Sequence, residues 1–177
     1  MYSNGFKKVK KGDHILAVFH QEDLLNYALD FLITGFERNE RIILMMDSFS
    51  KDEIRNRIRK EWDVENLEEL EAQNHIIIKT SDELVQWEKL HKEKSNFWHQ
   101  LTNQAIENGK SGLRVFTDTS GFFNKGKKNE LIQFESSLEK RFDFPCIVIC
   151  AYTTENAKSL NDDQNHALLD HHKSMWV

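Results

Sequence analysis

The sequence predicts an α/β fold of three layers, in which a mostly parallel sheet of five or slightly more strands lies between helices on both faces. Two observations lead to this prediction. Short apolar runs alternate with amphipathic segments along the chain, and residues 42–46 form an unbroken apolar run before Asp47. A strand that is apolar on both faces must be covered on both faces, as parallel sheets are by their crossover helices. Short connections between the five strand and helix pairs then imply right-handed crossovers.

Five strands are expected, each a short run rich in Ile, Val, Leu or Phe between polar segments. They cover residues 14–19, 41–47, 75–79, 113–118 and 146–152.

The first helix is predicted from apolar residues at helical spacing, among them Leu24, Ala28 and Leu32. It is expected to end near residue 34, with Gly35 as a left-handed C-terminal cap.

Two later helices begin with the spacing of a capping box, Ser50 with Glu53 and Thr80 with Glu83. The second of these segments runs to Gly109, and its apolar stripe is interrupted by a charged run. It is expected to form two helices or one kinked helix. Residues 119–128 are expected to be a loop, and a short last helix is expected in the tail.

Length and composition fit one domain. The chain has 177 residues with one proline and seven glycines, so no segment resembles a linker. Residues 1–12 are basic and polar and are expected to be flexible, whereas residues 13–177 are expected to form the domain. No stretch approaches the roughly 20 apolar residues of a membrane span, and no signal peptide is recognisable. The expected compartment is the cytoplasm, without membrane contact.

Charge and cysteine content restrict the partners further. Acidic residues outnumber basic ones by 29 to 24, which argues against a dedicated nucleic-acid surface. Cys146 and Cys150 lie on one predicted strand, roughly 13 Å apart at about 3.3 Å of rise per residue. This separation is too great for a disulfide, so two buried free thiols are expected.

Polar residues follow the predicted strands at the sheet edge where open parallel sheets bind ligands. His20, Asp47, Asp118 and Tyr152 are therefore candidate ligand-binding residues. Arg114 joins them, although as a cation on a buried strand it could equally pair with a carboxylate. Their expected roles are hydrogen bonding and charge pairing. No nucleophile arrangement is recognisable, and no catalytic residue is assigned.

Two groups of residues could hold a metal ion. Asp47 and Asp118 could place paired carboxylates around Mg²⁺, although capping of the following turns is the preferred interpretation. Four tail residues have helical spacing that suits a metal: His166, Asp170, His171 and His172. A solvated polar face is the preferred interpretation there, and neither a metal nor a cofactor is expected.

The turn after the first strand argues against nucleotide hydrolysis. A phosphate-binding loop needs glycines and a lysine, as in GxxxxGK[ST]. This chain has HQED at residues 20–23, and two carboxylates would repel a triphosphate.

Several segments together resemble the MEDS domain, a sensory domain of methanogens and methylotrophs named after a dichloromethane-responsive regulator. The segments are residues 13–47, AIENGKSGLRVFTDTS, LIQFESSLEKRFDFPCIVICAY and the histidine-bearing tail. The motifs are His14, Gly35 with Glu40, residues 109–114, Glu135 and Cys150-Ala151-Tyr152. The resemblance covers residues 13–172.

The resemblance implies a RecA/KaiC-like fold with a degenerate phosphate loop, which senses small hydrocarbon derivatives. Many relatives carry a kinase or DNA-binding module beside this domain, so the output of this chain would pass to a separate partner protein. The acidic first turn and Asn74, where relatives often have glycine, depart from the pattern.

The leading hypothesis is a non-enzymatic sensor that binds a small molecule at the carboxyl edge of the sheet. One alternative is a scaffold or interaction protein derived from a decayed RecA-like ATPase, which would form a homo-oligomer. A second is an enzyme with a metal ion on Asp47 and Asp118 or on the tail histidines.

Overall fold

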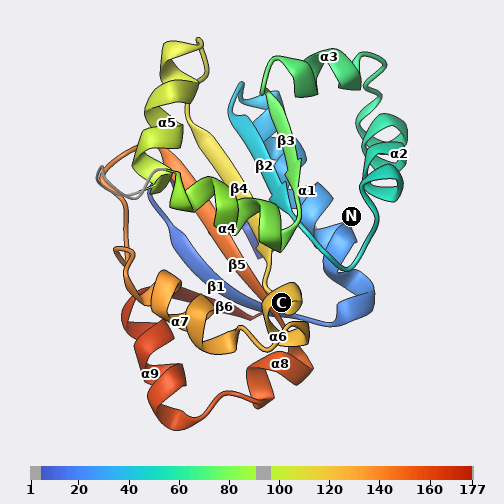
Figure 1. Ribbon diagram of the computed structural model, residues 1–177. Coiled ribbons are helices and arrows are strands. Elements are labelled where there is room, and N and C mark those ends of the chain that lie inside the picture. Colours follow the sequence, from blue (N-terminus) through green and yellow to red (C-terminus); the bar gives the residue numbers. More distant parts are fainter. Residues whose placement is uncertain (1–4, 91–96, 177) are drawn as a thin grey trace.

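A parallel six-stranded sheet forms the centre of the molecule (Figure 1). The structure is a computed structural model that describes residues 5–90 and 97–176. The strands are β1 (His14–Phe19), β2 (Arg41–Met45), β3 (Ile76–Lys79), β4 (Leu113–Asp118), β5 (Cys146–Thr153) and β6 (Lys173–Trp176). Their order in the sheet is β3-β2-β4-β5-β1-β6. The predicted α/β class and parallel sheet are confirmed, and β6 was not predicted.

Helices cover both faces of the sheet (Figure 1). One face packs against α1 (Leu24–Glu37), α2 (Lys51–Trp62) and α3 (Leu67–Ala72). The other packs against α4 (Ser81–Lys89), α5 (Phe97–Glu107), α6 (Ser120–Asn124), α7 (Lys128–Ser136), α8 (Thr154–Lys158) and α9 (Asp162–Asp170). This division follows from right-handed crossovers, because the connections from β1 to β3 run in one direction across the sheet and the later ones run in the other.

Helix α1 continues beyond its predicted end, and the expected cap at Gly35 is wrong. Gly35 lies inside the helix, and the left-handed residue after it is Asn39, with φ of 59°. The glycine is needed for a close approach instead. A Cβ atom at this position would lie 2.6 Å from Arg114 Nε and 2.7 Å from Glu40 Oε2.

Arg114 forms a buried ion pair at the amino end of β4. Its Nε donates to Glu40 Oε2 at 2.5 Å, and its Nη1 donates to the carbonyl of Phe31 at 3.3 Å. Both charged side chains are at most 4% exposed. Because each charge is desolvated, each depends on the other to remain in the core. The bond to Phe31 ties α1 to the sheet. The ion pair is the carboxylate pairing that the sequence left open for Arg114, and it lies at the opposite end of β4 from the carboxyl edge, where ligand binding was expected.

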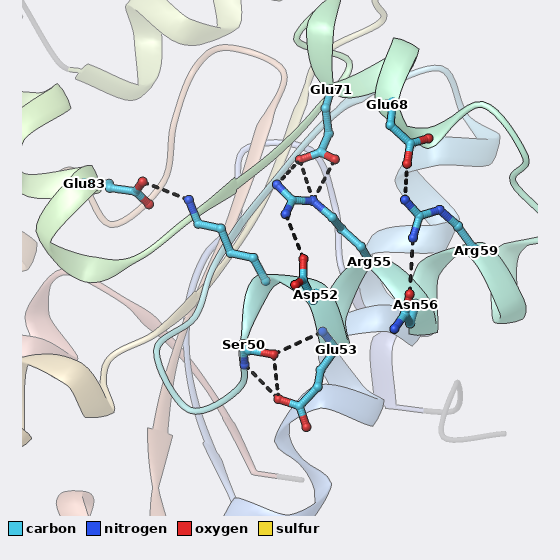
Figure 2. A network of polar contacts seen from close by, with 10 residues as sticks. Ser50, Asp52, Glu53, Arg55, Asn56, Arg59, Glu68, Glu71 and Glu83 are labelled. Atoms are coloured by element: carbon cyan, nitrogen blue, oxygen red, sulfur yellow. Dashed lines mark hydrogen bonds and ion pairs between the residues drawn. The ribbon is translucent and has the colours of Figure 1, made fainter.

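The capping boxes of α2 and α4 are confirmed. Ser50 Oγ accepts the Glu53 N–H at 3.2 Å, and the Glu53 carboxylate accepts the Ser50 N–H at 2.9 Å. Figure 2 shows this box beside two ion pairs that join α2 to α3. One is between Arg55 and Glu71, and the other is between Arg59 and Glu68. Helix α2 is therefore held at its start and along its exposed side.

The remaining segments agree with the prediction in part. Residues 5–8 form a short 3₁₀ helix, η1 (Gly5–Lys8), whose Phe6 packs on the α1 residues Tyr27 and Phe31. Residues 1–4 of the predicted flexible segment lie outside the described residues. The segment 80–109 contains two helices, α4 and α5, and residues 91–96 between them are not described. The predicted loop 119–128 contains α6. Within the described part of the chain, no helix combines the length and apolarity needed to cross a bilayer.

Candidate functional site

The carboxyl ends of β2 and β4 meet where the chain leaves the sheet toward opposite faces, a position at which α/β proteins bind ligands. Asp118 Oδ2 accepts a hydrogen bond from Ser48 Oγ at 2.6 Å, and its Oδ1 accepts one from the Ser120 N–H at 3.0 Å. Asp47 Oδ1 accepts the Ser81 N–H at 3.0 Å. The Asp118 contacts fit the capping interpretation, because Ser120 lies in the turn that follows β4. Asp47 differs, since the N–H group that it binds belongs to the first residue of α4, which follows β3.

No third acidic, histidine or cysteine side chain joins Asp47 and Asp118 in a metal-binding group within the described residues. His20 is also separate from them. It is exposed, its side chain does not cap the turn η2 (Gln21–Asp23), and β5 lies between its strand and β4. Of the five predicted residues, the structure thus brings only Asp47 and Asp118 together at the edge.

A cavity of about 350 Å³ lies beside this edge, over β2, β4 and β5 and between α4, α5 and α7. Its walls are apolar and are formed by Met45, Leu84, Trp98, Phe122, Leu131 and Leu138. Exposed polar side chains lie at its mouth: Lys89, Glu130, Gln133 and Ser137. The cavity is therefore an apolar space with a polar opening.

Four buried polar residues also line the cavity: Thr117, Thr119, Glu135 and Cys150. Thr117 Oγ1 donates to the carbonyl of Ile149 at 3.0 Å, which leaves its lone pairs free to accept a bond. The predicted site residue Tyr152 lies behind this group, where its hydroxyl donates to Glu135 Oε2 at 2.6 Å. Tyr152 therefore positions a lining residue and does not itself line the cavity.

Behind Glu135 and Cys150 lies a buried cluster that contains two histidines. His14 begins β1, and His172 immediately precedes β6. The pairing of β1 with β6 therefore brings the two histidines together. Their ring centroids are 3.8 Å apart. His14 Nε2 lies 3.5 Å from Cys150 Sγ, and His172 Nε2 lies 3.6 Å from Glu135 Oε2.

Burial governs the protonation of this cluster. Desolvation lowers the pKa of His14 to about 4 and that of His172 to about 3, in the second case with a further contribution from His14. Desolvation also raises the pKa of Glu135 to about 7, against the opposing effect of the Tyr152 hydrogen bond, and raises that of Cys150 well above its usual value. At neutral pH the imidazoles are uncharged, so the approach of His172 to Glu135 is not an ion pair.

The preferred interpretation of the tail as a solvated polar face is wrong for His172, which is 1% exposed. His171 is half-buried and bonded to the carbonyl of Leu138, whereas His166 and Asp170 are exposed on α9. The tail thus divides between surface and core, because α9 ends before His171 and the chain then turns into β6.

Glu135 and His14 were not among the predicted site residues, although the sequence contains a signal for each. Glu135 follows Leu131 by four residues in a helix whose apolar residues face the core, which places the carboxyl group on the buried side. His14 precedes Leu16 and Val18 at strand spacing and faces the same helices. The involvement of His172 depends on β6, which the sequence did not indicate.

Comparison with known proteins identifies a family. The family model described as "MEDS: MEthanogen/methylotroph, DcmR Sensory domain" matches residues 13–173. No curated protein and no solved structure matches the chain. The expected likeness to RecA and KaiC therefore stays a prediction.

Proposed function

Because the chain belongs to the MEDS family of sensory domains, we propose that it is a non-enzymatic cytoplasmic sensor with a small, largely apolar ligand. The ligand binds in the cavity between α4, α5 and α7. The observation that carries this proposal is the combination of a space of about 350 Å³, apolar walls and four buried polar groups. Small-molecule sites in proteins are of this kind, with volumes from about 300 Å³ upward.

The polar lining restricts the chemistry of the ligand. Thr117 Oγ1 can accept a hydrogen bond in addition to the one that it donates. The Glu135 carboxyl group can accept hydrogen bonds and, when it is protonated, can also donate one. Each group already has one protein partner, but a pure hydrocarbon would leave its remaining hydrogen-bonding capacity unused in a buried place, which is unfavourable. A hydrocarbon derivative with one hydroxyl or amino group satisfies both the walls and these polar groups.

In this proposal the signal arises from the helices around the cavity. Leu84 on α4 and Leu131 on α7 face the cavity from different helices, and both belong to the core on this side of the sheet. A bound molecule would bridge the two helices and restrict their relative motion. The change would then be passed to a separate signalling protein that contacts this face.

We test the proposal by calorimetric titration with straight-chain primary alcohols from propanol to octanol. Each buried methylene contributes about 0.8 kcal/mol, so the dissociation constant should fall about fourfold per carbon until the cavity is full. Leu84→Phe fills part of the cavity and should weaken the binding of the longer alcohols about tenfold or more.

The matched control is Leu169→Phe, the same change at a residue that is 44% exposed on α9 and does not line the cavity. It should leave alcohol binding unchanged. Binding that does not depend on chain length, or that is equally strong in both variants, would refute the proposed site.

A further inference from the structure

We propose that His14, Cys150, His172 and Glu135 form a binding site for a thiophilic divalent metal ion of the Zn²⁺ type. The proposal does not depend on a ligand in the cavity. The donor atoms of the two histidines and the cysteine all lie within 4.8 Å of one another, and all three residues are buried. Imidazole and thiolate donors are those that Zn²⁺ prefers, and a carboxylate can complete its tetrahedral shell.

The hydrogen bonds of both histidines direct a lone pair into the cluster. His14 Nδ1 lies 3.1 Å from the carbonyl of Glu139, and His172 Nδ1 lies 2.6 Å from the carbonyl of Leu168. A carbonyl oxygen only accepts, so each Nδ1 must carry the hydrogen. In a neutral imidazole the other nitrogen, Nε2, then has a free lone pair. Metal-binding histidines are oriented by such bonds to backbone carbonyls.

One of these lone pairs has no protein partner. His172 Nε2 is buried and makes no hydrogen bond within the described part of the chain, and Glu135 Oε2 lies 3.6 Å from it. Leaving a buried polar atom unsatisfied is unfavourable. A metal ion between this nitrogen and the Glu135 carboxylate would satisfy both.

The charges of the cluster also favour a cation. Glu135 is 2% exposed, and no lysine or arginine of the described residues pairs with it. A buried carboxylate without a cation is unfavourable when it is ionised. A divalent ion would neutralise the carboxylate together with the Cys150 thiolate, and the thiol proton would be released to solvent on binding.

The cluster must contract to bind the ion. Tetrahedral Zn²⁺ with bonds of about 2.0–2.3 Å places its ligand atoms roughly 3.3–3.6 Å apart, about one ångström closer than the widest spacing here. Three groups already position the ligands: the carbonyls of Glu139 and Leu168 and the hydroxyl of Tyr152, which donates to Glu135. Tyr152 is thus a positioning residue for this site.

The test uses the full chain, stripped of metal with a chelator and titrated with Co²⁺ and then Zn²⁺. We expect one equivalent of Co²⁺ to bind, with the visible bands of tetrahedral cobalt and a sulfur-to-cobalt charge-transfer band in the near ultraviolet. Zn²⁺ should displace it. Cys150→Ser should abolish the charge-transfer band and weaken binding by about 100-fold or more, beyond the 10- to 100-fold typical of residues that only support the ligands.

The matched control is Cys146→Ser on the same strand, since Cys146 is also a buried free cysteine but is not part of the cluster. It should bind Co²⁺ with an unchanged spectrum. A second variant, His166→Ala, tests for adventitious binding to the exposed tail, and it too should leave the spectrum unchanged. The proposal is overturned if the wild type binds no Co²⁺, if Cys150→Ser retains the band, or if either control removes it.

Discussion

The Glu135 side chain belongs to both proposed sites, because it lines the cavity and lies beside the two buried histidines. It is held by one strong hydrogen bond, from Tyr152 at 2.6 Å, but it has lost nearly all contact with water. Desolvation is the larger effect and raises its pKa to about 7. In the metal-free protein this carboxyl group is therefore partly protonated near neutral pH, and ionising it costs stability.

This environment predicts that the effect of Glu135→Gln on the free energy of unfolding depends on pH in chelator-treated protein. Between pH 4.5 and 7 the folded state binds more protons at this site than the unfolded state, so wild-type stability falls relative to the variant as pH rises. The difference in the free energy of unfolding should grow by about 1.4 kcal/mol per pH unit in this window, approach about 3 kcal/mol and level off above pH 7. Denaturant unfolding at several pH values measures it. A difference that is constant from pH 5 to 8 would contradict the prediction.

The candidate site residues differ in whether the sequence alone fixes their position in the fold. Asp47 and Asp118 follow apolar strands directly, so their position at the carboxyl edge could be read from the sequence. Arg114 could not be placed, because a buried strand does not reveal at which end its charged residue finds a partner. Its partner Glu40 precedes β2 and meets it only through the pairing of β2 with β4.

At the scale of elements, α1 depends on the absence of a side chain at one position. Glycine inside a helix costs about 1 kcal/mol relative to alanine, so propensity alone would make Gly35→Ala stabilising. The structure predicts the opposite. The new Cβ would lie 2.6 Å from two atoms of Arg114, which is held in its buried pair with Glu40 and cannot move aside without breaking it.

We therefore expect Gly35→Ala to lower the free energy of unfolding by about 1–3 kcal/mol, as overpacked core substitutions do. Thermal and denaturant unfolding measure the change. Glu37→Ala, at an exposed position near the end of the same helix, is the control and should change stability by less than about 0.5 kcal/mol. A stabilised Gly35→Ala variant would show that α1 does not need its close approach to β4.

At the scale of the molecule, the sequence indicated the sheet better than the site. Each of the five expected strands is an apolar run that must be buried on both faces, and this requirement is local. The short strand β6 was not predicted, because its sequence, KSMW, is only partly apolar. It lies at the edge of the sheet and pairs on one side only, with β1. The cavity was not predicted, because it exists only where α4, α5 and α7 pack over the sheet, and these helices are far apart in the sequence.

The same difference between inner and edge strands predicts the order of hydrogen exchange. Every residue of β4 and β5 is buried, and both strands are paired on both sides, whereas β6 is short, pairs only with β1 and exposes Lys173 and Ser174. Amide exchange followed by mass spectrometry should be slowest in β4 and β5 and clearly faster in β6, because edges open without global unfolding. Equal protection of β6 and β5 would instead mean that the sheet opens as one unit, and that His172 is held as firmly as the central strands.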